Sequence, residues 1–131
     1  MSELIIVGIA GPSGSGKTLL TDTIVEELGC SRVAILREDA YYKDLAGMSV
    51  PERARVNFDH PDSMDHDMLV EHLKDLRAGK GIDVPIYDYT EHTRTGRTEP
   101  ISSGKSIIVV EGILIFTDPA VRDLMDIKFF V

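Results

Sequence analysis

The chain has 131 residues, which is enough for one compact domain and too few for two of ordinary size. Hydrophobic residues make up 43% of it and charged residues 27%, a composition that excludes disordered, collagen-like and low-complexity chains. The 22 Asp and Glu outnumber the 14 Lys and Arg, and the formal charge of −8 argues against broad binding to nucleic acid or to anionic membranes.

The sequence contains a single cysteine, Cys30, which excludes an intrachain disulfide and any multi-cysteine metal site. A chain without disulfides fits a reducing compartment, so we expect a cytoplasmic protein. Residues 1–10 offer only a short apolar run without a basic leader, and we therefore expect neither a signal peptide nor a membrane anchor.

The first elements are predicted to be a strand, a helix and a second strand. Residues 4–10 form a nearly continuous, β-branched apolar run, typical of a strand buried on both faces of a parallel sheet. Apolar residues recur at helical spacing over residues 19–28, and Gly29 stands where a left-handed C-cap is expected. Residues 33–36 predict a second strand with Asp39 just beyond its carboxyl end.

The next helix is predicted over residues 68–76, where apolar residues again follow the helical period before Gly79. Its N-cap is expected at Asp62, Ser63 or Asp65, with Asp62 favoured. These short polar side chains accept hydrogen bonds from the first helical N–H groups.

Residues 82–101 alternate polar and apolar side chains, which predicts a β-hairpin with its turn at Gly96. The period of two puts Tyr87 and Tyr89 on one face of the arm, and His92 on the other unless a bulge redirects it. The arm ends with a basic side chain, Arg94.

A third buried strand is predicted over residues 106–110, directly before Glu111. A short helical piece at residues 121–125 and a strand over residues 128–131 complete the chain. Strands separated by helices imply right-handed crossovers and a parallel sheet with helices on both faces. We therefore expect an α/β fold that forms one domain over residues 1–131.

The strongest motif is the complete P-loop pattern G-x-x-x-x-G-K-[ST], which lies between the first predicted strand and the first predicted helix. Glycines let the backbone curl so that several N–H groups face one polyphosphate, and the helix points its positive end at the anion. Lys17 supplies charge toward the outer phosphates, and the Thr18 hydroxyl can bind magnesium. The expected nucleotide-binding residues are Gly11, Ser13, Gly14, Ser15, Gly16, Lys17 and Thr18.

Two acidic residues, Asp39 and Glu111, follow predicted strands, and ligands of open α/β sheets bind beyond the carboxyl ends of the strands. Phosphoryl transfer needs a metal ion, which neutralises the phosphate oxygens, and a carboxylate that orients or deprotonates the attacking hydroxyl. The two carboxylates can divide these roles, with Glu111 on the magnesium side. Tyr41 and Tyr42, close to Asp39, can wall a substrate pocket.

Other polar clusters predict no metal site. The four histidines lack the helical i, i+4 pairing and the supporting cysteines of a zinc site. The acidic residues within 59–67 suit a helix N-terminus better than a calcium loop, because the glycine and the final Glu of that loop are absent.

Five segments together resemble the uridine kinase (uridine-cytidine kinase) family, in order and spacing along essentially the whole chain. The P-loop is shared by many NTPases, whereas Asn-Phe-Asp-His-Pro-Asp and Pro-x-Tyr-Asp-Tyr-x-x-His-x-Arg are narrower signatures. The segments are residues 11–18, 38–42, 57–62, 85–94 and 111–113.

The resemblance implies a P-loop kinase that moves the γ-phosphate of ATP or GTP to the 5′-hydroxyl of uridine or cytidine, forming UMP or CMP in pyrimidine salvage. It implies that Asp39 is the catalytic base, assisted by Lys17, and that Thr18 and Glu111 hold Mg²⁺. The partners are then a small-molecule nucleoside and, as in many relatives, further copies of the chain, with no nucleic acid or membrane.

The same resemblance assigns the acceptor site. Asp59 matches the acid that hydrogen-bonds the ribose hydroxyls, and Tyr87 and His92 match the groups that read the pyrimidine edge. Tyr42 and Tyr89 match aromatic walls of that pocket, and Arg94 is the last residue of the same signature.

Two departures from the family pattern bear on activity. Glu38 replaces the usual Gln or similar residue before the catalytic Asp39, and its charge disfavours ionisation of that acid if both are poorly solvated. Family members also continue into an arginine-bearing lid, a last strand and a helix, so we expect this chain to be a fragment with weak or no turnover alone.

Two alternative functions remain open on the sequence. A phosphoribulokinase-like sugar-phosphate kinase would need basic residues for the acceptor's phosphate, and Arg94 or Arg97 could serve. A nucleotide-binding fragment without catalysis is the second alternative.

Overall fold

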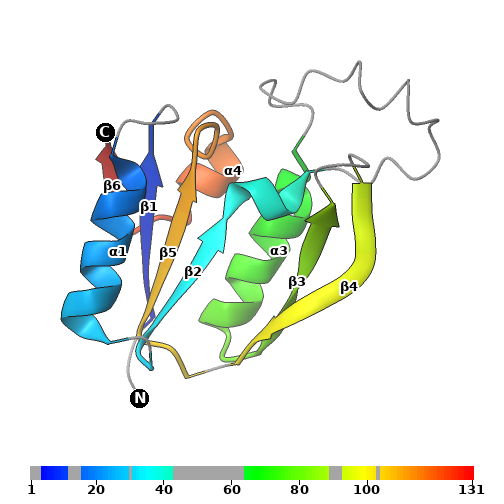
Figure 1. The fold of residues 1–131 in the computed structure, drawn as a ribbon, viewed down its shortest axis with the longest axis horizontal. Coiled ribbons are helices and arrows are strands. Elements are labelled where there is room, and N and C mark those ends of the chain that lie inside the picture. The colour runs from blue at the N-terminus through cyan, green and yellow to red at the C-terminus, as the bar shows by residue number, and fades with distance from the viewer. Residues whose placement is uncertain (1–3, 12–15, 30, 43–63, 89–92, 103) are drawn as a thin grey trace.

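The computed structural model describes residues 4–11, 16–29, 31–42, 64–88, 93–102 and 104–131 (Figure 1). The elements in chain order are β1 (Ile5–Ala10), α1 (Lys17–Leu28), β2 (Val33–Arg37), the 3-10 helix η1 (Glu38–Tyr41), α3 (His66–Arg77), β3 (Ile82–Asp88), β4 (Thr93–Ile101), β5 (Ile107–Gly112), α4 (Pro119–Arg122) and β6 (Ile127–Phe130).

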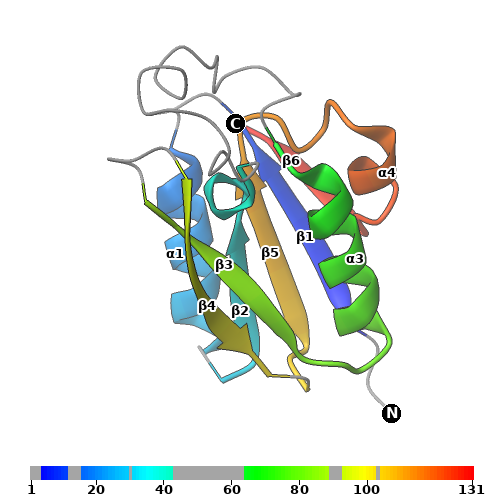
Figure 2. The same ribbon diagram turned by 90° about the vertical axis from the view of Figure 1, so that its right-hand side faces the viewer.

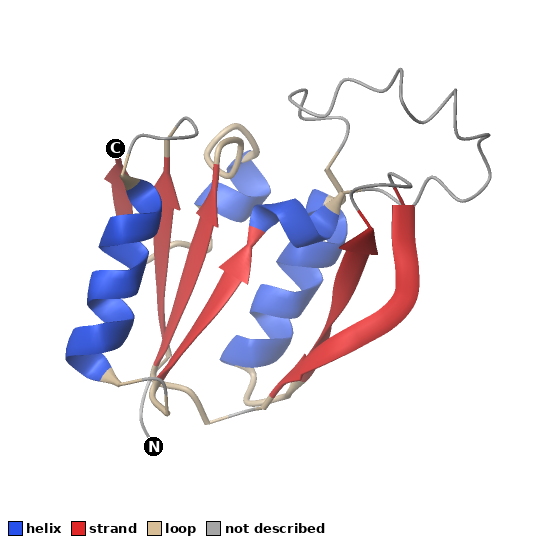
Figure 3. Cartoon of the chain, in the orientation of Figure 1, coloured by secondary structure: helices blue, strands red, loops and turns tan. Residues whose placement is uncertain are grey.

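Four strands form one sheet in the order β2-β5-β1-β6, and each neighbouring pair is parallel. All four carboxyl ends therefore lie at one edge of this sheet, where η1 also begins (Figure 3). The α/β fold with a parallel sheet, expected from the sequence, is confirmed.

Helices cover both faces of the sheet: α1 packs on one face, and α3 and α4 pack on the other (Figure 2). The alternation of side chains along β1 explains this arrangement. Val7 and Ile9 pack in a core cluster with Leu20 of α1, whereas Ile6 packs with Leu69 of α3 and other residues of the second cluster. Burial on both faces accounts for the continuous apolar run of the sequence.

Helix α3 buries Leu69, Leu73 and Leu76 and ends before Gly79, whose φ of 85° is left-handed. The Asp65 carboxylate caps the helix by accepting a hydrogen bond of 3.1 Å from the Met68 N–H. The favoured cap, Asp62, is therefore wrong, because the helix begins three residues later than that choice requires.

A second sheet consists of β3 and β4, which pair in antiparallel fashion as the predicted hairpin. Its turn is not at Gly96, which lies inside β4 at a register shift opposite Ile86. There the Thr95 hydroxyl donates to the Ile86 carbonyl at 3.0 Å and accepts from the Arg97 N–H at 3.1 Å. Gly96 has a φ of 81°, a conformation that both bulges and turns favour, so the local sequence pattern did not distinguish a bulge from a turn.

The last elements follow the prediction with shifted bounds. The helical piece begins at Pro119 rather than at residue 121, because the Asp118 carboxylate caps it by accepting from the Ala120 N–H at 2.9 Å. β6 pairs with β1 and leaves Phe129 and Phe130 exposed. Within the described residues, no helix has the length and apolar character needed to span a membrane.

Candidate active site

The sheet register brings three expected site residues to the same edge. Ile9, Glu111 and Arg37 are consecutive partners across β1, β5 and β2. Gly11 follows Ile9 by two residues, and Asp39 follows Arg37 by two. Neighbouring strands lie about 4.8 Å apart, so the ends of β1 and β2 flank that of β5 at a spacing of about 10 Å.

The structure describes the two ends of the P-loop, Gly11 after β1 and Gly16 before α1. Gly16 caps α1 in the left-handed conformation, with φ 96° and ψ 6°, and its carbonyl accepts from the Leu20 N–H at 3.1 Å. The first turn of α1 carries no acidic residue, so no carboxylate of that turn offsets the positive end of the helix dipole. This end is therefore suited to an anion.

Several P-loop positions lie outside the described part of the chain. Ser13, Gly14 and Ser15 belong to residues 12–15, and the side chains of Lys17 and Thr18 are not described either. Their roles in binding phosphate and magnesium remain predictions.

Glu111 is buried at the end of β5, with its side chain 8% exposed, and its Oε2 accepts from Arg37 Nη1 at 2.9 Å. A carboxylate suits Mg²⁺, which prefers hard oxygen ligands. A carboxylate has about four lone-pair sites on two oxygens, so it can bind an arginine and a cation at the same time. Glu111 therefore fits a magnesium ligand whose charge is balanced by Arg37.

Glu38 and Asp39 lie on different sides of η1. Asp39 is exposed, whereas the Glu38 side chain is completely buried. The condition for an effect of Glu38 on Asp39, that both acids are poorly solvated, is not met, because only Glu38 is withdrawn from water.

The buried Glu38 carboxylate has two partners. Its Oε2 lies 2.7 Å from His66 Nε2, and its Oε1 accepts from the Leu114 N–H at 2.8 Å. The other ring nitrogen of His66, Nδ1, lies 3.4 Å from Asp118 Oδ2. One imidazole thus lies between two carboxylates from distant parts of the chain.

The charges around His66 set its protonation. Burial by itself would lower the pKa of His66, but the hydrogen bond and charge of Glu38, helped by Asp118, outweigh burial and raise the pKa above its usual 6.5. Both ring nitrogens face carboxylate oxygens, and both can donate only when the ring is protonated. The geometry therefore favours a positively charged His66.

Gly112 is required beside this cluster. A Cβ added there would overlap Glu38 Cβ and would lie 2.9 Å from the Glu38 carboxyl carbon. The close approach lets η1 pack directly on the end of β5.

Two aromatic contacts flank η1, and they differ in kind. Tyr42 and Tyr87 stack at a tilt, with ring centroids 5.2 Å apart, so an expected pocket wall meets an expected base-reading residue. Tyr41, also expected as a wall, is instead completely buried, and its hydroxyl lies 2.7 Å from His72 Nδ1. Tyr41 is therefore part of the core.

The remaining acceptor residues are only partly covered by the structure. Asp59, Tyr89 and His92 lie outside the described residues. Arg94 is the register partner of Tyr87 across the hairpin, but its side chain is not described. The structure thus brings the aromatic pair together and leaves the other acceptor assignments as predictions.

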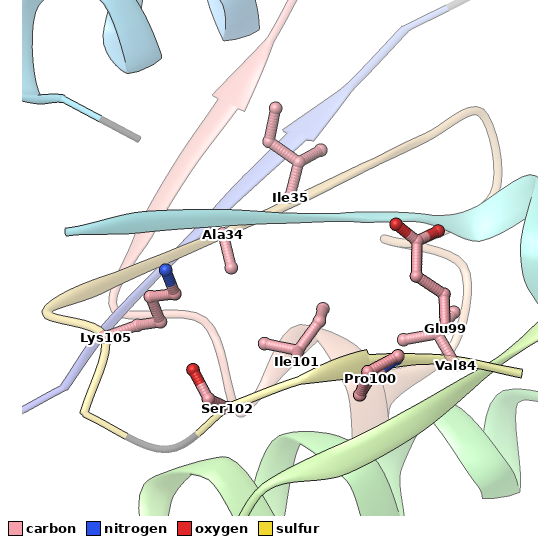
Figure 4. Close-up of a pocket in the computed structure, with 8 residues that line it drawn as sticks. All are labelled: Ala34, Ile35, Val84, Glu99, Pro100, Ile101, Ser102 and Lys105. Carbon is pink, nitrogen blue, oxygen red and sulfur yellow. The ribbon is translucent and has the colours of Figure 1, made fainter. Parts of the chain in front are cut away.

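A cavity of about 310 Å³ lies between β2 and the hairpin (Figure 4). Its lining includes Ala34 and Ile35 from the first half of β2 and Pro100 and Ile101 from the end of β4. Ala34 and Ile35 lie before the carboxyl end of β2, so the cavity is separate from the edge that carries Asp39 and Glu111.

Sequence reasoning missed the roles of His66, Leu114 and Asp118. His66 was considered only as a metal ligand, and its partners are 28 and 52 positions away, too far for a local pattern to reveal. The one signal in the sequence was the Glu directly before the expected catalytic Asp39. If that second acid is buried, it needs a hydrogen-bonding or charged partner elsewhere in the chain.

Known proteins are similar to this chain in sequence. A sequence profile of the "Phosphoribulokinase / Uridine kinase family" matches residues 6–131. The uridine kinase of Shewanella amazonensis (strain ATCC BAA-1098 / SB2B) is 46% identical over 133 residues, which cover 98% of this chain and 62% of that protein. The uridine kinase of Haemophilus influenzae (strain PittEE) is 47% identical over 131 residues, covering 97% of this chain and 61% of the relative. The chain thus spans about three fifths of the length of these relatives.

Solved structures share the fold. One described as a possible uridine kinase from Bacillus stearothermophilus matches with a TM-score of 0.72 at 20% identity, over 99% of this chain and 71% of that one. Phosphoribulokinase from Rhodobacter spheroides matches with a TM-score of 0.71 at 14% identity, over 98% of this chain and 50% of that one.

Proposed function

Because the chain belongs to the phosphoribulokinase/uridine kinase family, we propose that it carries the phosphate site and the catalytic carboxylate of a nucleoside kinase. The proposed reaction transfers the γ-phosphate of ATP or GTP to the 5′-hydroxyl of uridine or cytidine and yields UMP or CMP. Residues 1–131 are taken as the N-terminal portion of one kinase domain. Pyrimidine salvage, a cytoplasmic location and a homo-oligomeric state belong to the same proposal.

One observation carries this proposal. The turn that bears Asp39 starts at the sheet edge shared with Gly11 and Glu111 and ends at the contact between Tyr42 and Tyr87. An exposed carboxylate between a phosphate loop and an aromatic pair suits an acceptor that has both a hydroxyl and a flat base.

The roles proposed for the chain's own residues follow from this arrangement. The backbone of residues 11–18 and Lys17 hold the polyphosphate, and Asp39 accepts the proton of the attacking hydroxyl. Thr18 and Glu111 would hold Mg²⁺, which when bound neutralises charge on the phosphate oxygens.

The acceptor is proposed to bind between the hairpin and η1. Tyr42 and Tyr89 wall the pocket, Tyr87 and His92 read the pyrimidine, and Asp59 holds the ribose, with Arg94 in the same site. A site that hydrogen-bonds its substrate rejects analogues strongly, because a mismatch leaves buried polar groups unpaired.

The test measures ADP release by the complete protein with ATP and Mg²⁺ in three parallel reactions: uridine, ribulose 5-phosphate and no acceptor. Release that depends on uridine supports the proposal. Release only with ribulose 5-phosphate identifies a sugar-phosphate kinase, and nucleotide binding without release in any reaction identifies a non-catalytic module.

A further inference from the structure

A buried histidine joins three segments that are far apart in sequence. His66 is the first residue of α3, and only 7% of its side chain is exposed. It contacts Glu38 of η1 through one ring nitrogen and Asp118, the N-cap of α4, through the other. The first helical turn of α3 is therefore tied to the turn after β2 and to the segment after β5.

Glu38 extends this connection to the end of β5. Its second oxygen accepts a hydrogen bond from the Leu114 N–H, two residues past Gly112, and the Gly112 backbone packs against its side chain. A single carboxylate thus attaches the turn that carries Asp39 to the strand end that carries Glu111. The pairing of β2 with β5 already places these segments side by side, and this hydrogen bond adds a second connection between them beyond the strand ends.

The 3-10 helix that carries Asp39 is anchored to α3 on both sides of that residue. Its own side chain faces solvent, while the buried residues of η1 are Glu38 and Tyr41 on either side of it. These two residues engage His66 and His72 of α3, respectively. These contacts anchor the backbone of η1 on both sides of Asp39.

We propose that His66 is a positioning residue, which holds Asp39 at a fixed place relative to the end of β5 through its contact with Glu38. This inference rests on the proposed function, since it takes Asp39 to be the base. A buried ion pair often stabilises a protein no more than apolar packing would. Its contribution here is a defined geometry, which matters because small misplacements of a catalytic group cost large factors in rate.

The experiment uses the complete protein with His66→Gln, Glu38→Gln and the double substitution. Arg77→Gln is the matched control: Arg77 lies at the opposite end of α3 and forms a 2.8 Å ion pair with Asp126, away from η1. Glu38→Gln keeps the shape of the side chain and removes only its charge. It therefore serves as the decisive variant if His66→Gln does not fold.

The first readout is uridine phosphorylation. His66→Gln is expected to lower kcat about tenfold or more while the KM for ATP stays close to that of the wild type, because the phosphate loop is untouched. The double variant should be no slower than His66→Gln, since both substitutions break one connection. Arg77→Gln should leave kcat unchanged. An unchanged kcat in folded His66→Gln, or effects that multiply in the double variant, overturns the proposal.

The second readout does not require activity. Hydrogen exchange measured by mass spectrometry should show faster exchange in η1 and at Leu114 in His66→Gln, and wild-type exchange there in Arg77→Gln. Unchanged protection of both segments in His66→Gln overturns the inference even if the wild-type protein phosphorylates no nucleoside. Failure of the wild type to phosphorylate any nucleoside, in contrast, overturns the proposed function.

Discussion

Glu38 and Asp39 are adjacent acids whose side chains lie in different environments. Glu38 is completely buried against His66, and Asp39 is exposed at the edge of the sheet. The short 3-10 helix makes this possible, because it turns consecutive side chains to different sides. The inner acid anchors the turn, and the outer acid faces solvent, where the proposed reaction would take place.

Replacing Asp39 by Asn should abolish transfer and preserve the fold. The amide cannot accept the proton of the acceptor hydroxyl, and loss of a general base costs about 10²–10⁴ in rate. Because Asp39 is exposed, the free energy of unfolding should change by no more than about 0.5 kcal/mol. The measurement compares ADP release, ATP binding and the unfolding midpoint of Asp39→Asn with those of the wild type. Transfer at the wild-type rate would remove Asp39 from the base role.

The ion pair of His66 should make stability depend on pH in a defined direction. The pKa of His66 is raised in the folded state by Glu38 and Asp118, against the effect of burial, so folding favours the protonated ring. Its contribution is complete below the unfolded pKa of about 6.5 and is lost as pH rises through the higher folded pKa. The free energy of unfolding of the wild type should therefore exceed that of His66→Gln most clearly near pH 6, by up to about 3–5 kcal/mol.

Urea unfolding of both proteins between pH 5.5 and 9 measures this difference directly. The groups facing His66 are Glu38 and Asp118. Of its sequence neighbours, Asp65 caps α3 and Asp67 is exposed. Arg77→Gln is the control, because Arg77 binds Asp126 and the Leu124 carbonyl at the other end of α3. A gap between wild type and His66→Gln that widens as pH rises would refute a charged His66.

Gly112→Ala should destabilise the protein more than Gly8→Ala. A Cβ at position 112 overlaps Glu38 Cβ, which is fixed to the backbone of η1, so the turn must move. A Cβ at position 8 meets the side-chain ends of Phe116 and Met125 at 2.8 and 2.9 Å, and these can rotate away. Overpacking costs about 1–3 kcal/mol, and thermal unfolding should place Gly112→Ala at or above the top of that range. Equal unfolding midpoints for the two variants would contradict the close contact between η1 and β5.

Replacing Arg37 by Gln should strengthen the magnesium dependence of nucleotide binding. Arg37 Nη1 holds Glu111 Oε2 at 2.9 Å and competes with a cation for the negative charge of that carboxylate. The arginine side chain is 49% exposed, so its removal should cost stability only about 0–1 kcal/mol. ATP affinity, titrated with and without Mg²⁺, should show a larger gain from the metal in Arg37→Gln. The same gain in both proteins would argue that Glu111 does not face the cation.

Local patterns were sufficient to predict most of the fold. The run of apolar residues in β1 and the helical period of α3 predicted both elements correctly, because burial on two faces or on one face leaves a direct mark on the sequence. The hairpin was predicted but its turn was not, since Gly96 serves a bulge that has the same backbone requirement.

The candidate site was predictable only where one short motif carries the chemistry. The P-loop and the positions of Asp39 and Glu111 after strands follow from adjacent residues. The contacts of His66 with Glu38 and Asp118 join residues separated by 28 and 52 positions, and only the packing of α3 on the sheet brings them together.

The most direct test of the account is a crystal structure of the complete protein with a non-hydrolysable ATP analogue, Mg²⁺ and uridine. We predict that the polyphosphate contacts the backbone N–H groups of residues 11–18 and that the Asp39 carboxylate lies about 3 Å from the 5′-hydroxyl. A uridine bound with its 5′-hydroxyl remote from Asp39, or a polyphosphate bound away from that loop, would contradict the proposed site.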